Sequence, residues 1–168
     1  MLIGRADGDI GYRILDIGEV MKIVIINGPN LNLLGKREPS IYGTRSMEQV
    51  LVDIQRAHMD IHLHYLQSNH EGDLIDWLQT FGFNSTNSET VTGIILNAGG
   101  YTHTSVALRD AVACCEVPII EVHISDITQR EEFRKISLLT DVCTHSIIGH
   151  GTEGYLEAVE WLVKRVES

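Results

Sequence analysis

The 168-residue sequence has few of the features that mark unusual protein classes. It contains three prolines and three cysteines, and no hydrophobic stretch is long enough to cross a membrane. Hydrophobic residues make up 43% and charged residues 21%, which is close to the average for folded domains and excludes disordered and fibrous classes. The length and composition therefore predict one domain with its own buried core.

Positive charge is also scarce. The 13 lysines and arginines are outnumbered by 23 acidic residues, so the formal net charge is -10. This excess of negative charge argues against nucleic acid or an anionic membrane as the main partner. An anionic substrate would have to be attracted by a few locally placed arginines.

The three cysteines form no recognisable metal or redox motif. Cys114 and Cys115 are adjacent and Cys143 lies apart, so there is no C-x-x-C pair. We expect reduced thiols in a cytoplasmic protein, because disulfides belong mainly to oxidising compartments.

Residues 1–20 differ from the rest of the chain. Glycines, acids and arginines are scattered through them, without the continuous apolar core of a signal peptide. Met21 directly precedes a strongly apolar segment. We therefore expect residues 1–20 to be an extension that contributes nothing to activity, and residues 21–168 to form the domain.

From Met21 onward, short apolar runs alternate with helical patterns. Lys22–Asn27 (KIVIIN) is a β-branched run, typical of a strand that is buried on both faces. Residues 92–97 and 117–123 are predicted as buried strands in the same way, and residues 147–148 as a short strand. Residues 62–67 alternate in polarity, which predicts a more exposed strand. Helices are predicted at 46–59, 71–81, 104–114 and 152–166. This alternation predicts a flavodoxin-like doubly wound α/β fold, a five-stranded parallel sheet with helices on both faces. Its binding site should lie at the carboxyl ends of the strands.

The connection after the first strand, residues 27–43, is longer than the two to six residues usual between a strand and a helix. Gly35 and Gly43 bracket Arg37 and Tyr42, so this segment can be a lid that closes on a substrate. The alternative is a surface loop with an ordinary exposed arginine and tyrosine.

The strand that ends at Asn97 is followed by AGGYTHTS. The glycine pair lets the backbone turn sharply into a helix, whose first amides can bind a carboxylate or a hydroxyl group. The alternative is a helix start that is capped by serine or threonine.

Glu121 and His123 are two residues apart on a predicted strand, so both side chains point to one face. A carboxylate that reaches an imidazole can orient it and favour its charged form, as a general acid requires. The alternative is a purely structural histidine. Arg130 and Arg134 would share one face if their segment is helical, and could instead pair with the neighbouring glutamates.

Two further patterns are weak. Residues 149–154 match G-x-G-x-x-G, but only fourteen residues follow, too few for the second strand of a dinucleotide site, so we expect close backbone packing there. His62 and His64 could be metal ligands, but no third ligand or H-E-x-x-H pattern accompanies them. We expect surface histidines and no metal.

Several segments together resemble the type II dehydroquinases of the shikimate and quinate pathways. They are INGPNLNLLGKREPSIYG at 26–43, QSNHEGDLIDWL at 67–78, ILNAGGYTHTSVALRDA at 95–111, IEVHIS and REEFRKIS within 120–137, and GHGTEGY at 149–155. The similarity covers residues 21–168 in order. It implies a 3-dehydroquinate dehydratase that eliminates water through an enolate, without metal, cofactor or lysine Schiff base.

The resemblance also implies roles for individual residues. Tyr42 would take a proton from the carbon beside the ketone, and Arg37 would stabilise the phenolate. Asn30 would stabilise the enolate oxygen, directly or through a water. His123 would protonate the leaving hydroxyl with support from Glu121. The other implied substrate contacts are Asn97, His103, Asp110, Ile124, Ser125, Arg130 and Arg134.

Asp110 matches a residue that a neighbouring subunit contributes, so the resemblance implies a homo-oligomer of trimers assembled into a dodecamer. Asp126 departs from the asparagine usual in the family and would add a negative charge near the substrate contacts. The alternative function is a flavodoxin-like module that binds a flavin or a nucleotide. The first loop disfavours it, because prolines and leucines stand where a phosphate loop needs serine, threonine and glycine.

Overall fold

The computed structural model describes residues 20–36, 45–83 and 90–168. Within these ranges, five parallel strands form one sheet in the order β2-β1-β3-β4-β5. The strands are β1 (Lys22–Asn27), β2 (His62–Gln67), β3 (Gly93–Asn97), β4 (Ile119–His123) and β5 (His145–Ile148). This order is the flavodoxin-like one, with its reversal between β1 and β3, and it confirms the predicted fold class.

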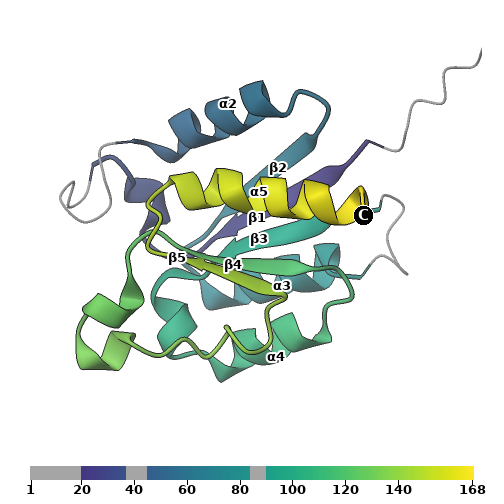
Figure 1. Cartoon of the computed structure of the whole chain (residues 1–168). Helices are drawn as coiled ribbons and strands as arrows, with labels where there is room; N and C mark the ends of the chain where they lie inside the picture. Colours follow the sequence, from purple (N-terminus) through teal and green to yellow (C-terminus); the bar gives the residue numbers. More distant parts are fainter. Residues whose placement is uncertain (1–19, 37–44, 84–89) are drawn as a thin grey trace, which may run out of the picture.

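Two helices cover each face of the sheet (Figure 1). α2 (Met47–Ala57) and α5 (Glu153–Val166) lie on one face, and α3 (Glu71–Phe81) and α4 (Val106–Cys114) lie on the other. The side chains of β1 alternate between the two cores: Ile23 and Ile25 face α2 and α5, and Val24 and Ile26 face α3 and α4. The strand is apolar throughout because both of its faces are covered.

The helix starts follow from local capping. Ser46 caps α2: its hydroxyl accepts the Gln49 N–H, and the Gln49 side chain accepts the Ser46 N–H. The helix predicted at 104–114 begins later, at Val106, because a 3₁₀ helix, η2 (Gly99–His103), comes first and Ser105 then caps α4.

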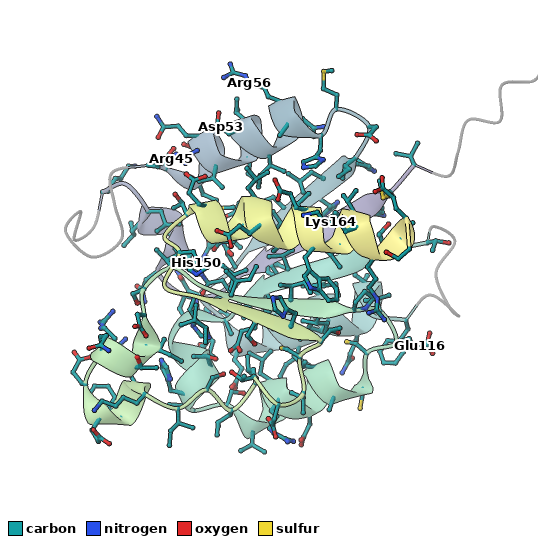
Figure 2. The ribbon with its side chains drawn as sticks, in the orientation of Figure 1. Arg45, Asp53, Arg56, Glu116, His150 and Lys164 are labelled. Carbon is teal, nitrogen blue, oxygen red and sulfur yellow. The ribbon has the colours of Figure 1, made fainter. Side chains whose placement is uncertain are left out.

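Arg45, which precedes α2, connects the two helices on one face of the sheet. Its guanidinium pairs with Asp53 of α2 (Figure 2). It also pairs with Glu153, the first residue of α5. The start of α2 is thereby fixed to the start of α5.

β2 is an edge strand, and its side chains are more exposed than those of β1, as its sequence predicted. His62 is exposed, while His64 lies against Phe81 with ring centroids 5.3 Å apart. Burial, and then the charge of Lys22, lower the pKa of His64. In the part of the chain that the structure describes, no three histidine, cysteine or acidic side chains are grouped so as to hold a metal ion. None of the described helices combines the length and the apolar character needed to cross a bilayer.

Candidate active site

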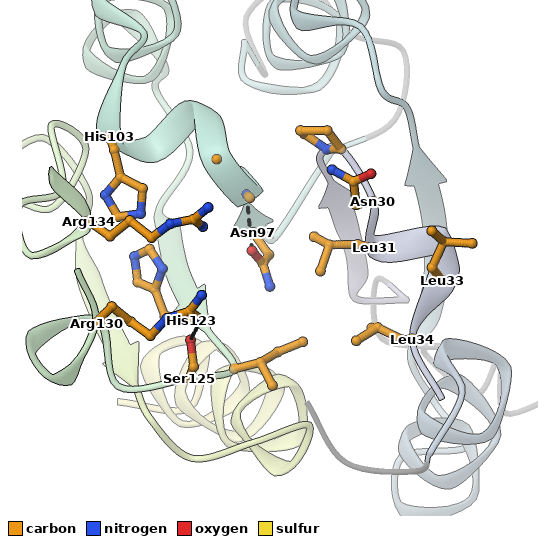
Figure 3. A pocket seen from close by; sticks show the side chains of 14 residues that line it. Asn30, Leu31, Leu33, Leu34, Asn97, His103, His123, Ser125, Arg130 and Arg134 are labelled. Carbon is orange, nitrogen blue, oxygen red and sulfur yellow. Dashed lines mark hydrogen bonds between the residues drawn. The ribbon is translucent and has the colours of Figure 1, made fainter. Parts of the chain in front are cut away.

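A cavity of about 170 Å³ opens at the carboxyl ends of β1, β3 and β4 (Figure 3). The strand order reverses beside it, which is where open α/β sheets bind ligands. Three loops form its walls: Pro29, Asn30, Leu31, Leu33 and Leu34 after β1; Asn97, Gly99, Gly100 and His103 from the end of β3 and η2; and His123, Ile124, Ser125, Arg130 and Arg134 from the end of β4 and beyond.

Most of the predicted site residues meet in this cavity. The lining includes Asn30, Asn97, His103, His123, Ile124, Ser125, Arg130 and Arg134. Glu121 lies beneath it, in contact with His123. Asp110 is exposed on α4 and is not part of the lining. Arg37 and Tyr42 lie outside the described residues.

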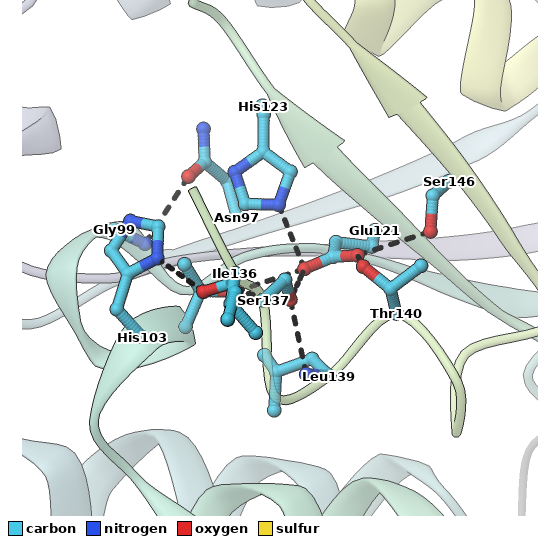
Figure 4. A network of polar contacts seen from close by, with 11 residues as sticks. Asn97, Gly99, His103, Glu121, His123, Ile136, Ser137, Leu139, Thr140 and Ser146 are labelled. Atoms are coloured by element: carbon cyan, nitrogen blue, oxygen red, sulfur yellow. Dashed lines mark hydrogen bonds and ion pairs between the residues drawn. The ribbon is translucent and has the colours of Figure 1, made fainter. Parts of the chain in front are cut away.

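Glu121 is a buried carboxylate that is surrounded by donors, with only 1% of its surface exposed (Figure 4). Oε1 accepts hydrogen bonds from His123 Nε2 at 2.7 Å, Thr102 at 2.9 Å and Ser137 at 2.5 Å. Oε2 accepts from Thr140 at 2.6 Å and Ser146 at 3.0 Å. The donors come from β4, η2, the segment after residue 134 and β5, so this carboxylate joins four parts of the fold.

These contacts set the charge of Glu121. Burial by itself raises the pKa of the carboxyl group, but the hydrogen bond and charge of His123 and the hydrogen bonds of Ser137 and Thr140 outweigh burial and lower the pKa to about 2. An ionised carboxylate only accepts hydrogen bonds. The Nε2 atom of His123 therefore carries a hydrogen and donates it to Glu121. The other ring nitrogen, Nδ1, is the one left for a ligand in the cavity.

Arg130 follows one 3₁₀ turn, η3 (Ile127–Gln129), and Arg134 is the last residue of another, η4 (Glu132–Arg134). No continuous helix contains both arginines, so the condition for a shared helical face is not met. Both still line the cavity. The expected pairing with glutamate is found at Glu131, whose carboxylate lies 3.5 Å from Arg130 Nε and 3.4 Å from Arg134 Nε. Arg130 also donates to the Ser125 hydroxyl at 3.3 Å.

The lining is positive although the whole chain is negative. Two guanidinium groups and two imidazoles face the cavity, and none of its described lining residues is acidic. His103 Nδ1 donates to the Ile136 carbonyl at 2.8 Å, which leaves its Nε2 as the nitrogen that can meet a ligand. Placed arginines thus provide the local attraction that an anionic substrate needs in a chain with a net charge of -10.

Asn97 is held by residues that the sequence did not single out. Its Oδ1 accepts the Gly99 N–H at 3.2 Å, and its Nδ2 donates to Tyr155 Oη at 2.9 Å. Tyr155, fully buried on α5, donates in turn to Asn27 Oδ1 at 2.8 Å. Burial raises the pKa of Tyr155, so it stays a neutral phenol. This chain of bonds fixes the amide orientation of Asn97 and leaves its second Nδ2 hydrogen free to act as a donor. The sequence signals for Tyr155 were its place on the apolar face of a helix and its place at the end of the family-like segment 149–155.

The glycine turn after β3 serves close packing. Gly99 has φ 58° and packs against Pro29, and a Cβ on Gly28 would lie 2.4 Å from the Ala98 carbonyl oxygen. The N–H of Gly99 is already bonded to Asn97, so it is not a free amide for a ligand.

The segment 149–154 packs closely too, as expected. Gly149 has φ 83°, and a Cβ there would lie 3.1 Å from the Cβ of Asp126. Asp126 is exposed outside the cavity lining, and its carboxylate accepts from the N–H and the hydroxyl of Thr128 at 2.9 and 2.7 Å. The expectation that its charge acts close to the substrate contacts therefore weakens.

Fold and site together define an α/β protein of the flavodoxin-like class, with a small cationic cavity above a buried glutamate–histidine pair. Comparison with known proteins gives the family. The chain matches the family model "Dehydroquinase class II" over residues 21–163. The chain belongs to the class II dehydroquinase family.

Its relatives match over nearly their whole length. A 3-dehydroquinate dehydratase from Halothermothrix orenii is 45% identical over 148 residues, 87% of this chain and 96% of that protein. One from Roseiflexus castenholzii is 47% identical over 145 residues, 85% of this chain and 88% of that protein. The crystal structure of a type II dehydroquinase from Butyrivibrio crossotus is similar with a TM-score of 0.79 and 46% identity, covering 87% of this chain and 99% of that one.

Proposed function

We propose that this chain converts 3-dehydroquinate to 3-dehydroshikimate by eliminating water through an enolate, using its own side chains. Family membership and the names of its relatives support the reaction. The observation that carries the mechanism is the buried pair of Glu121 and His123 at the floor of a cavity with two arginines in its wall.

The first step is proton removal. Tyr42, as a phenolate, takes the proton from the carbon beside the ketone, and the electron pair of that C–H bond forms the enolate. An ordinary tyrosine is neutral near pH 7, so the phenolate needs a nearby cation, which is the role of Arg37. The side chain of Asn30, on the cavity wall, donates to the enolate oxygen directly or through a water.

The second step is loss of the hydroxyl group. The enolate re-forms the ketone, the new C=C bond forms, and the C–O bond breaks. His123 gives a proton to the departing oxygen, which leaves as water. Because Nε2 is bonded to Glu121, the proton comes from Nδ1. Glu121 remains an anion throughout and stabilises the charged ring before the transfer.

The substrate carboxylate is bound by hydrogen-bond donors from the ends of β3 and β4. We assign this role to the second Nδ2 hydrogen of Asn97 and to the backbone amides of Ile124 and Ser125, with His103 and Arg134 binding the ring oxygens. Arg130, which contacts both Ser125 and Glu131, sets the charge of the wall.

The active enzyme is a homo-oligomer in this proposal, with trimers assembled into a dodecamer. Asp110 is exposed on α4, and Val106 on the same helix is 61% exposed. An acidic side chain beside an exposed apolar one suits a subunit contact that delivers Asp110 to the neighbouring cavity. The three free cysteines agree with a reducing compartment such as the cytoplasm.

The test is an absorbance assay for the conjugated enone that forms from 3-dehydroquinate. We expect steady turnover by the full-length protein. No enone at micromolar enzyme would exclude the proposed function. Borohydride added with substrate should leave the activity intact, and inactivation would show a lysine Schiff base instead. A flavin absorbance in the purified protein would favour the binding-module alternative.

A further inference from the structure

Asn69 lies outside the cavity and yet contacts two of the three loops that form its walls. Its Oδ1 accepts the backbone N–H of Asn30 at 2.9 Å, and its backbone carbonyl accepts the hydroxyl hydrogen of Tyr101 at 2.9 Å. Asn30 belongs to the loop after β1, and Tyr101 belongs to η2. Figure 3 shows Asn30 across the cavity from His103, which is the last residue of η2. One exposed residue that follows β2 therefore links the loop after β1 to η2.

The backbone of Asn30 needs such a contact. Its φ of 67° is in the left-handed region, and among the described residues no other non-glycine residue has a positive φ. This conformation is strained for a residue with a side chain, and it persists where neighbouring contacts hold it. At Asn30 the N–H is bonded to Asn69, and the carbonyl accepts the Leu33 N–H at 3.1 Å as η1 (Leu31–Leu33) begins.

The amide of Asn69 can adopt only one orientation here. Its Oδ1 receives two donors, the Asn30 N–H and Gln67 Nε2 at 3.3 Å, so it must be the oxygen that faces them. Gln67 also donates to the Gly28 carbonyl at 3.2 Å. The feature that matters at position 69 is therefore an acceptor oxygen, and a carboxylate could supply it equally well.

We propose that Asn69 is a positioning residue, which holds Asn30 at the place and angle where its side chain stabilises the enolate oxygen. The inference rests on the proposed function, because it assigns Asn69 a part in that reaction. A displaced oxyanion donor weakens the transition state more than the bound substrate. The loss of the Asn69 acceptor should therefore lower kcat more than it raises KM.

The experiment measures kcat and KM for 3-dehydroquinate with the full-length protein and three variants. Asn69→Ala removes the acceptor, and Asn69→Asp keeps one. Gln79→Ala, on an exposed position of α3, is the matched control. We expect Asn69→Ala to lose about tenfold or more in kcat with less than about a threefold change in KM. Asn69→Asp should lose less than about threefold, because its carboxylate accepts the same N–H.

Each outcome decides between the two ideas. An inactive unmodified protein would exclude the proposed function, whatever the variants do. If that protein is active but Asn69→Ala equals Gln79→Ala, or Asn69→Asp is as poor as Asn69→Ala, the positioning role is wrong. A rise in KM alone would also overturn it. The midpoint of thermal unfolding, Tm, separates these results from misfolding. Substitution of an exposed side chain should change Tm by no more than about 2 °C. If Asn69→Ala is less stable than this, Asn69→Asp serves as the folded reference.

Discussion

Nε2 of His123 lies 2.7 Å from Oε1 of Glu121, and the two side chains are 6% and 1% exposed. Four hydroxyl groups complete the hydrogen bonds of the carboxylate. Because an anion with these donors is far more stable than the protonated acid, the pair fixes which imidazole nitrogen faces the cavity. The same carboxylate also ties the segment after Arg134 to β4. The local structure, and in our proposal the chemistry, therefore depend on the charge of Glu121.

Acid should remove the stabilisation that comes from Glu121. Its pKa lies near 2 in the folded protein, below the ordinary value of 4.5. A carboxyl group whose pKa is lower in the folded protein stabilises the fold at pH values above its pKa in the unfolded chain, here by about 3 kcal/mol. This stabilisation is lost as the pH falls from the unfolded-state pKa to the folded-state pKa. We expect urea denaturation at fixed protein concentration to show Glu121→Gln far less stable than the unmodified protein at about pH 6, with the difference shrinking towards about pH 3. A constant difference would contradict this.

His123→Ala should separate binding from chemistry. The variant keeps the arginines and Asn97, but it lacks the proposed acid for the leaving hydroxyl. We expect kcat to fall by about 10²–10⁴-fold while KM changes little. His145→Ala, an exposed histidine on β5, is the control for loss of an imidazole elsewhere. An unaltered kcat in His123→Ala would remove His123 from the acid role.

The variants Tyr42→Phe and Arg37→Ala should both turn over 3-dehydroquinate slowly. The first lacks the proposed base, and the second lacks the cation that we propose keeps the phenolate charged. We expect losses of at least about 100-fold in kcat for each. Circular dichroism should remain that of the unmodified protein. Near-normal turnover by Tyr42→Phe would refute the base assignment.

Tyr155→Phe should act on the substrate through Asn97. Loss of the hydroxyl leaves Asn97 Nδ2 and Asn27 Oδ1 without a partner, at a cost of about 1–3 kcal/mol in stability. We also expect KM to rise about tenfold, because the Asn97 amide can then rotate. In the Asn97→Ala background the same change should alter KM by less than about twofold. Additive effects of the two substitutions would mean that Tyr155 is only structural.

The sequence predicted the sheet well because β1, β3 and β4 are short strands that are buried on both faces. β1 and α3 match their predicted limits, and α4 and β4 each begin two residues later than predicted because local caps and turns decide the ends. It also predicted contact between Glu121 and His123, since a spacing of two on a strand puts both on one face.

The supporting contacts could not be predicted in the same way. The hydroxyl groups on Glu121 come from positions 102, 137, 140 and 146, and no spacing relates them. The bonds of Asn69 to Asn30 and of Tyr155 to Asn27 join residues far apart in the chain. Such contacts depend on the tertiary fold. Arg37 and Tyr42 remain predictions from resemblance.

The most direct test of the account follows proton exchange and elimination together in heavy water. His123→Ala and Tyr42→Phe would each be incubated with 3-dehydroquinate, and NMR would measure deuterium beside the ketone while absorbance follows the enone. In the proposed mechanism, Tyr42 forms the enolate and His123 completes the elimination. We therefore predict that His123→Ala still exchanges the proton beside the ketone, and does so faster than it forms enone. Tyr42→Phe should neither exchange this proton nor form enone. This division of roles would be contradicted if His123→Ala lost exchange and elimination to the same extent. It would also be contradicted if Tyr42→Phe still exchanged the proton.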